Sequence, residues 1–279
     1  DNWFTSLKKI TSISSIADNY DYFLFDQWGV LHDGSNVFED AKDCLIKLKQ
    51  KEKKIILISN SSKLTEFTRL NLKNLGIDDS LYDHSITSGQ IASDSFQKDI
   101  FNQYGEKCFP MSLSIEKIKM FKLKTVKSIK NANFVLIADI KPNSNLFDFT
   151  DDLKIMMDLK IPLVCTNPDF QVDNMGSLEM CGGTIAQLYE DMGGTVHRYG
   201  KPYQPIYSNI INKFKIKSSK NVIAIGDSFN HDILGAMKQG FDSLFIENGI
   251  HREDMRDLER KNWYLSQFKP KYSQFMLKF

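Results

Sequence analysis

The chain has 279 residues, of which 42% are hydrophobic and 25% charged, a composition typical of globular proteins. Its 36 basic residues balance 35 acidic residues, so bulk charge gives no reason to expect nucleic acid or an anionic membrane as a partner. The length suggests two domains, with one large domain as the alternative.

The cysteines and the hydrophobic runs indicate a cytoplasmic protein. No apolar run approaches the length of a membrane span, and residues 1–16 are too polar for a signal peptide. The four cysteines have no spacing typical of zinc sites or of a small disulfide framework, so we expect reduced, mostly buried thiols. They are Cys44, Cys108, Cys165 and Cys181.

The first part of the chain alternates between strand and helix patterns. Residues 20–26 form an apolar, aromatic-rich run that predicts a buried strand, and residues 37–51 show helical spacing. Residues 54–59 are β-branched without alternation, which is typical of a parallel sheet that is covered on both faces. Residues 63–75 then predict a helix that stops at Gly76.

The same alternation returns near the end of the chain. Residues 204–214 predict a helix, and residues 221–226 predict a strand. Residues 231–239 predict another helix, which Gly240 ends, and residues 243–247 predict a short strand. Strands and helices in this order predict an α/β fold with a Rossmann-like, doubly wound parallel sheet.

The middle of the chain carries apolar elements of its own. The pattern predicts strands at residues 134–138 and 162–165, and helices at residues 147–159 and 184–192. A segment of this length with its own elements is a second module and not a loop. We therefore predict a core at residues 1–84 and 197–279, interrupted by an inserted α/β cap domain at residues 85–196.

Polar residues stand where the predicted strands end. Asp26 ends the first strand, Ser59 and Asn60 end the second, and Asp227 ends a late strand. The carboxyl ends of parallel strands line one crevice, so these side chains are expected to converge there. Mg²⁺ would neutralise the converging carboxylates. The alternative is that each polar residue only caps the helix that follows.

Four short segments resemble the motifs of the haloacid dehalogenase superfamily, in the same order and spacing. These are residues 25–34 (Phe-Asp-Gln-Trp-Gly-Val-Leu-His-Asp-Gly), 58–61 (Ile-Ser-Asn-Ser), 200–202 (Gly-Lys-Pro) and 226–232 (Gly-Asp-Ser-Phe-Asn-His-Asp). The insert resembles the large α/β cap of class IIA, which includes 4-nitrophenylphosphatase-like and sugar-phosphatase-like members. Each motif alone is weak, but four motifs in register are specific.

The resemblance implies a Mg²⁺-dependent hydrolase. Asp26 would be the nucleophile that forms an aspartyl-phosphate, which water then hydrolyses. The other oxygen of Asp26, the backbone carbonyl of Trp28 and the carboxylate of Asp227 would ligate the metal ion. Asp232 would support the ion directly or through water.

The resemblance also implies phosphate-binding and substrate-binding residues. Ser59, the amide of Asn60 and Lys201 would hold the phosphoryl oxygens, with Lys201 neutralising charge during transfer. In the cap, Asn167 and Asp169 either face the substrate or form an Asx-Pro turn, and the sequence leaves both open.

The chain departs from the family at Trp28, where family phosphatases usually carry a second aspartate that protonates the leaving group and then activates water. An indole is a hydrogen-bond donor only, and loss of a general acid or base costs about 10²–10⁴-fold in rate. Three explanations stay open. The substrates have good leaving groups, such as acyl or aryl phosphates; another residue, with His32 the nearest histidine, supplies the proton; or catalysis is largely lost.

Two functions follow from these observations. The first is a phosphatase, weak or specialised, that acts on a small phosphorylated metabolite. The second is a degenerate protein that binds such a ligand without turnover. A dinucleotide-dependent oxidoreductase is disfavoured, because no Gly-x-Gly-x-x-Gly follows the first strand. The resemblance also allows a homodimer, since related capped proteins often pair through the cap.

Overall fold

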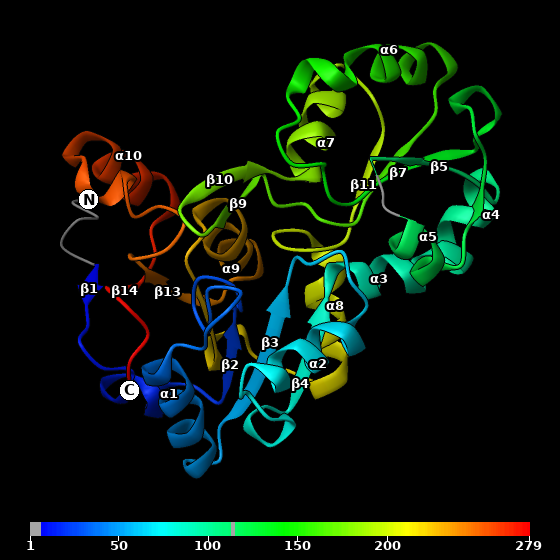
Figure 1. Ribbon diagram of the computed structural model, residues 1–279. Helices are drawn as coiled ribbons and strands as arrows, with labels where there is room; N and C mark the ends of the chain where they lie inside the picture. Colours follow the sequence, from blue (N-terminus) through cyan, green and yellow to red (C-terminus); the bar gives the residue numbers. More distant parts are fainter. Residues whose placement is uncertain (1–6, 113–114) are drawn as a thin grey trace. The chain divides into compact units, whose positions relative to one another are not determined.

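The computed structural model describes residues 7–112 and 115–279. The chain divides into two compact units (Figure 1). The first unit comprises residues 1–59, 69–86 and 207–279, and the second comprises residues 60–68 and 87–206. Most of the second unit is therefore one continuous segment that interrupts the first.

The first unit is built on a seven-stranded sheet with the order β1-β14-β13-β12-β2-β3-β4. Every pairing from β1 through to β3 is parallel. The strands are β1 (Lys8–Lys9), β2 (Tyr22–Phe25), β3 (Lys54–Ser59), β4 (His84–Thr87), β12 (Val222–Gly226), β13 (Asp242–Ile246) and β14 (Tyr272–Gln274). The predicted parallel α/β architecture is confirmed.

The strand order places a topological switch point between β2 and β12. From β2 the chain proceeds through β3 to β4 on one side, whereas β12, β13 and β14 extend the sheet on the other side. Ligands of open α/β sheets bind beyond the carboxyl ends of the strands at such a point. We therefore expect ligand-binding residues directly after β2 and β12.

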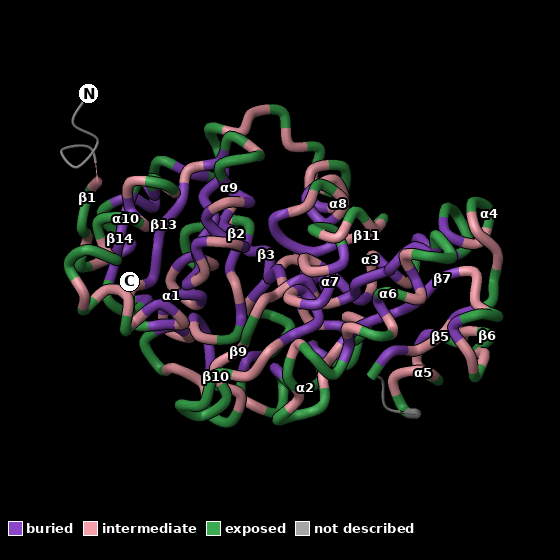
Figure 2. Tube along the Cα trace, turned by 90° about the horizontal axis from the view of Figure 1, so that it is seen from above, coloured by how far each residue is buried: buried purple, intermediate pink, exposed green. Residues whose placement is uncertain are grey.

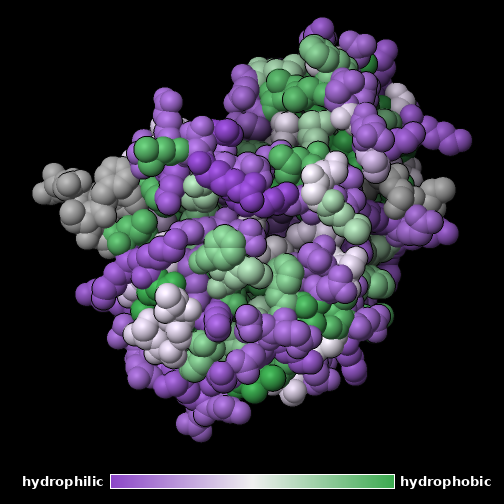
Figure 3. Space-filling view, turned by 60° about the vertical axis from the view of Figure 1, so that its left-hand side comes forward, coloured by the Kyte–Doolittle hydropathy of each residue, from purple (hydrophilic) through white to green (hydrophobic). Residues whose placement is uncertain are grey.

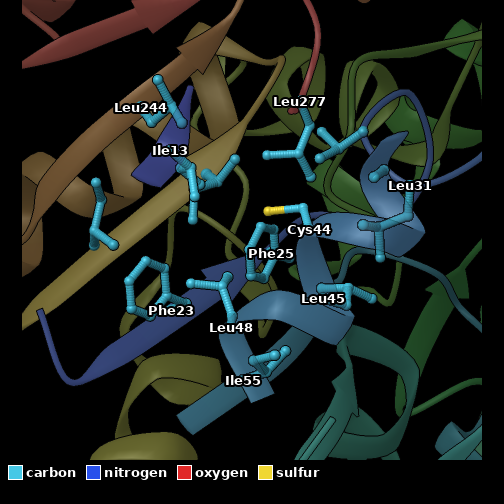
Figure 4. Close-up of a cluster of buried hydrophobic side chains, with 14 of the residues drawn as sticks. Ile13, Phe23, Phe25, Leu31, Cys44, Leu45, Leu48, Ile55, Leu244 and Leu277 are labelled. Atoms are coloured by element: carbon cyan, nitrogen blue, oxygen red, sulfur yellow. The ribbon is translucent and has the colours of Figure 1, made fainter. Parts of the chain in front are cut away.

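A hydrophobic core fixes these strands in place (Figure 4). Phe23 and Phe25 of β2 are fully buried and stack with ring centroids 6.4 Å apart. The helix α1 (Glu39–Gln50) buries Cys44, Leu45 and Leu48 in the same cluster. Figure 2 shows the strands of this sheet mainly as buried chain, except the exposed β1, while most of α1 alternates between buried and intermediate residues.

Further helices complete this part of the chain. Besides α1 they are α2 (Thr65–Asn74), α8 (Gln204–Phe214), α9 (Leu234–Gln239) and α10 (Leu258–Phe268). A π-helix, η9 (Phe229–Ile233), precedes α9. Short 3-10 helices are η2 (Ile13–Ser15), η3 (Ala17–Asn19), η4 (Asp79–Leu81), η8 (Ser219–Asn221) and η10 (Asp254–Arg256).

The second unit has a five-stranded parallel sheet with the order β11-β8-β7-β5-β6. The strands are β5 (Lys107–Met111), β6 (Lys124–Thr125), β7 (Phe134–Ile137), β8 (Leu163–Cys165) and β11 (Val196–Arg198), with a separate antiparallel hairpin of β9 (Gln171–Asn174) and β10 (Ser177–Met180). The helices are α3 (Ser88–Ser95), η5 (Phe96–Ile100), α4 (Phe101–Tyr104), α5 (Ile115–Phe121), η6 (Ile129–Asn131), η7 (Leu146–Phe149), α6 (Thr150–Leu159) and α7 (Gly182–Asp191). An α/β module inserted into the core sequence is thus observed, as predicted.

The limits of the units lie close to the predicted domain boundaries without coinciding with them. The main segment of the second unit begins at residue 87 and ends at residue 206, against a predicted cap of residues 85–196. Residues 60–68 also group with this unit. The boundaries of the domains themselves stay a prediction.

All four cysteines are buried and free, as expected. The face in Figure 3 is largely hydrophilic, with hydrophobic side chains scattered among polar ones. Within the described residues, no helix is both long enough and apolar enough to cross a membrane.

Candidate active site

Three carboxylates of the first unit gather where β2 and β12 end. Ligand oxygens of Asp26, Asp227 and Asp232 all lie within 4.8 Å of one another. Asp26 directly follows β2 and Asp227 directly follows β12, and the two strands are parallel neighbours that pair Phe25 with Ile225. The amide of Asp26 continues this ladder by donating to the carbonyl of Ile225 over 2.9 Å. The sheet therefore brings together acids that are about 200 positions apart in sequence.

The loop after β2 passes very close to this cluster. Gly29 has a φ of +84°, and a Cβ at this position would collide with the carboxylate of Asp227. Only glycine combines that backbone conformation with such a close approach. The turn is closed by the carbonyl of Gln27, which accepts from the amides of Val30 and Leu31 over 3.2 and 2.8 Å.

Burial and mutual repulsion control the charge of the cluster. Asp227 and Asp232 are buried, and burial, followed by the charges of Asp26 and Asp232, raises the pKa of Asp227 well above its ordinary value. A hydrogen bond from the amide of Ile250 to Oδ2 of Asp227, at 2.9 Å, offsets part of this shift. A bound cation would reverse it, since positive charge favours the ionised carboxylate. Three converging carboxylates are an oxygen donor set that suits a hard divalent ion such as Mg²⁺.

The fourth motif holds Asp232 through a π-turn. The amides of Asp232 and Ile233 both donate to the carbonyl of Ser228, over 3.0 and 3.1 Å, and the amide of Ser228 donates to Oδ2 of Asp232 over 3.1 Å. The sequence predicts an ordinary helix from His231, but the structure has η9 across this position. Such π-bulges occur often at functional sites, where they redirect a side chain.

Sequence reasoning missed the loop after β13. Besides the Ile250 amide, this loop provides His251, whose Nε2 accepts from the amide of Phe229 over 3.2 Å. The Nδ1 of His251 lies 3.0 Å from Oδ2 of Asp254. Its position beyond the carboxyl end of a strand next to β12 is a signal that could have indicated this second layer of contacts.

Trp28 is held against the loop that carries it. Gly34 has a φ of +96°, and a Cβ there would lie 2.5 Å from Cη2 of the Trp28 ring. The His32 ring packs edge-on against the indole, with centroids 5.7 Å apart. Even so, 41% of the Trp28 surface remains exposed. At the position of the family's second aspartate, the structure thus has Trp28, whose ring packs against Gly34 and His32 and is partly exposed.

Two titratable side chains further along this loop, His32 and Asp33, make local hydrogen bonds. Nδ1 of His32 accepts from the amide of Gly34 over 3.0 Å, and burial lowers the pKa of this imidazole. Oδ1 of Asp33 accepts from the amides of Asn36 and Ser35 over 2.8 and 2.9 Å, and these bonds lower the pKa of Asp33. At neutral pH His32 is therefore neutral and Asp33 ionised, which argues against either as the proton donor.

Of the residues predicted to bind phosphate, Ser59 belongs to the first unit, and Asn60 and Lys201 belong to the second. Ser59 is the last residue of β3, the strand next to β2. In the second unit Asn60 and Lys201 are both buried, and the Asn60 side chain clamps the Lys201 backbone: Oδ1 accepts from the Lys201 amide over 2.7 Å and Nδ2 donates to the Lys201 carbonyl over 2.9 Å. Because its side chain is used in this way, Asn60 would bind phosphate through its backbone amide.

Asn167 and Asp169 form a turn that contacts this clamp. Oδ1 of Asn167 accepts from the amide of Asp169 over 3.2 Å, which is the Asx turn that the Asn-Pro-Asp sequence favours. Oδ1 of Asp169 accepts from Nδ2 of Asn60 over 2.8 Å. Asp169 therefore joins the set that holds Lys201, and contact of either turn residue with a substrate stays a prediction.

Two family models match this chain over the segments that carry these motifs. One, described as haloacid dehalogenase-like hydrolase, matches residues 23–113. The other, described as HAD-hydrolase-like, matches residues 198–270. The chain belongs to the haloacid dehalogenase-like hydrolases. The predicted superfamily is confirmed.

Solved structures share this fold over nearly the whole chain. A haloacid dehalogenase-like hydrolase from Brucella suis superposes with a TM-score of 0.83 at 24% identity and covers 96% of this chain and 99% of its own. A possible sugar phosphatase from Cytophaga hutchinsonii gives 0.77 at 20% identity, with coverage of 96% and 98%. The 4-nitrophenylphosphatase from Thermotoga maritima gives 0.70 at 21% identity, with coverage of 93% and 95%. A comparison with curated protein sequences gives no match.

Proposed function

We propose that this protein is a Mg²⁺-dependent phosphatase that hydrolyses a small phosphorylated metabolite through an aspartyl-phosphate at Asp26. The observation that carries the proposal is the gathering of Asp26, Asp227 and Asp232 within 4.8 Å at the switch point of the sheet. Structural neighbours named as 4-nitrophenylphosphatase and possible sugar phosphatase support phosphate esters as substrates.

Each residue has a role in this proposal. Asp26, Asp227, Asp232 and the backbone carbonyl of Trp28 would hold Mg²⁺, which when bound neutralises the carboxylates and the phosphate. A carboxylate oxygen of Asp26 would attack phosphorus. Ser59, the Asn60 amide and Lys201 would hold the phosphoryl oxygens and stabilise their developing charge. A cytoplasmic location and a homodimer stay predictions.

The test is hydrolysis of 4-nitrophenyl phosphate with and without Mg²⁺. The parent is expected to show turnover that requires the metal, and Asp26→Asn is expected to show none, because an amide is a far weaker nucleophile than a carboxylate. Asp33→Asn is the matched control, since it makes the same change in the same loop at an exposed carboxylate that binds only local amides.

The outcome also separates the second candidate function. That candidate, a protein that binds a phosphorylated ligand without turnover, is favoured by the loss of the second aspartate at Trp28. Equal inertness of the parent and Asp26→Asn, with inorganic phosphate still bound by both in calorimetry, would establish binding and end the phosphatase proposal.

A further inference from the structure

Trp28 combines two features that bear on the leaving group of the substrate. It occupies a position at which a side chain could donate a proton, and it replaces a carboxyl group there with an indole that cannot. It is also a large aromatic residue that is 41% exposed, and its chain neighbour Gly29 lies against Asp227 of the acidic cluster.

The loop offers no obvious substitute for the missing acid. The His32 imidazole is buried, and its Nδ1 accepts from the Gly34 amide at 3.0 Å. The Asp33 carboxylate accepts from two amides of its own turn, at 2.8 and 2.9 Å. Both side chains therefore make local contacts, and neither is placed as a replacement for the second aspartate.

A more acidic leaving group can compensate for the missing proton donor in the first step. A phenol has a pKa of about 10, whereas an aliphatic alcohol is nearly as weak an acid as water, at about 16. A phenolate that leaves unassisted therefore has an advantage of up to about 10⁶-fold, which exceeds the 10²–10⁴-fold that a general acid contributes. An aromatic leaving group would also stack on the indole.

We infer that the substrate is a phosphate monoester of a phenol-like aromatic alcohol, whose ring contacts Trp28 and which leaves as the free oxyanion. This inference rests on the proposed function. Asp26 oxygen forms a bond to phosphorus while the bond from phosphorus to the aryl oxygen breaks, and the electron pair leaves with that oxygen. Solvent then protonates the phenolate. Water attacks phosphorus in the second step, which releases phosphate, frees the Asp26 carboxylate and delivers one proton to solvent.

The indole is built into the loop and is not an incidental surface residue. Gly34, at φ +96°, leaves space for the ring where a Cβ would lie 2.5 Å from it, and the His32 ring packs against the indole with centroids 5.7 Å apart. A side chain held in this way loses little conformational entropy when a flat ligand stacks on it. The exposed part of the ring is therefore suited to hold an aromatic group.

The experiment is a leaving-group series with Mg²⁺ present. It compares kcat/KM for substituted phenyl phosphates, glycerol phosphate as an alkyl ester and acetyl phosphate as an acyl phosphate. The variants are Trp28→Leu, Trp28→Phe and Trp28→Asp. The control is Trp263→Leu, which removes another exposed tryptophan, on α10.

We expect kcat/KM of the parent to rise steeply with the acidity of the phenol, and glycerol phosphate to be turned over at least about 10³-fold more slowly than phenyl phosphate. Trp28→Leu should lower kcat/KM for phenyl phosphates by about 2–10-fold and lower it less for acetyl phosphate, which has no ring to stack, while Trp28→Phe restores most of the loss. Trp28→Asp should raise glycerol phosphate turnover by about 10–100-fold. The control should behave as the parent.

Two kinds of failure are distinguishable. Comparable kcat/KM for glycerol phosphate and phenyl phosphate, or equal effects of Trp28→Leu on phenyl and acetyl phosphates, would overturn the aromatic assignment while Asp26-dependent hydrolysis persists. Absence of Asp26-dependent hydrolysis of every ester in the series would instead overturn the proposed function.

Discussion

Removal of one charge from the acidic cluster should have opposite effects on the metal-free and metal-bound protein. Oxygens of Asp26, Asp227 and Asp232 lie within 4.8 Å of one another. At that separation and an effective dielectric constant of about 20, each pair of ionised carboxylates repels by about 3 kcal/mol. Protonation of Asp227 limits this cost. We therefore expect Asp227→Asn to stabilise the metal-free protein by about 2 kcal/mol, which corresponds to a rise in Tm of about 4–8 °C.

The sign of the pH dependence follows from the raised pKa of Asp227. A group whose pKa is raised by folding stabilises the protein fully below its unfolded pKa, and this stabilisation is lost as the pH rises through the folded pKa. The gain from Asp227→Asn should therefore grow as the pH is raised toward neutrality. Mg²⁺ at 100 times its Kd should stabilise the parent by about 2.7 kcal/mol and the variant hardly at all.

The assay is thermal unfolding between pH 5 and 8, with EDTA or with Mg²⁺. Asp43→Asn is the matched control, because it removes one half-exposed acid from α1, whose ion pair is with Lys47 at 2.8 Å. That change should alter stability by less than about 1 kcal/mol. A metal-free Asp227→Asn protein less stable than the parent, together with an undiminished response to Mg²⁺, would refute a shared cation site.

Three further changes probe other contacts of the site. Asn60→Ala should lower kcat for 4-nitrophenyl phosphate by about 10–100-fold with a smaller change in KM, because the Lys201 backbone loses two hydrogen bonds. If the hydrogen bonds from Asn60 to Lys201 have no role in catalysis, steady-state kinetics would show an unchanged kcat. Gly34→Ala should cost about 1–3 kcal/mol and shift Trp28 fluorescence, because φ is +96° and the new Cβ would meet the indole; an unshifted emission spectrum would contradict this contact. Burial lowers the pKa of His251, so the unfolded state binds a proton at a higher pH than the folded state. The free energy of unfolding should therefore fall by up to about 1.4 kcal/mol per pH unit below about pH 6.5. His251→Gln should make this pH dependence weaker, as measured by urea unfolding at several pH values.

The elements that could be predicted from the sequence are those whose pattern and ends agree. The predicted bounds of β3 (Lys54–Ser59) and α8 (Gln204–Phe214) match the structure. The buried run of β3 has no alternation, and the predicted α2 ends just before Gly76, which has a φ of +98°. In these segments the intrinsic propensity, the burial pattern and the residues at the ends all favour the same secondary structure. The tertiary contacts therefore do not change the structure that the local sequence favours.

The missed strands are those that depend on their neighbours. β4 (His84–Thr87) is short and partly polar at the edge of the first sheet. β5 (Lys107–Met111) contains Pro110, which argues against a strand in an inner position. However, its outer neighbour β6 pairs only with Lys107 and Cys108, so no ladder partner on that side faces Pro110. The proline is tolerated because β5 is an edge strand at that residue, which only the register reveals.

The site was predictable where it depends on side chains that follow strands. The carboxylates of Asp26 and Asp227 are visible in the sequence, and parallel topology is enough to join them. For the contact from the Ile250 amide to Asp227 the topology indicates the loop but no side chain indicates the residue, because every residue except proline carries a backbone N–H. The role of Asn60 was hidden for a related reason, since its partner is the backbone of Lys201.

Position 28 shows how one residue of a motif can lose one role and keep another. The contact to a metal ion expected there uses the backbone carbonyl, which any side chain leaves intact as long as the loop keeps its path. That path depends on Gly29 and on the turn closed by the Gln27 carbonyl, not on the indole. Proton transfer, by contrast, needs a titratable side chain. A tryptophan in place of an aspartate at position 28 therefore changes which leaving groups can depart, while the cluster of Asp26, Asp227 and Asp232 stays assembled. The contacts with Gly34 and His32 hold the indole in one position, which suits it to bind a flat ligand.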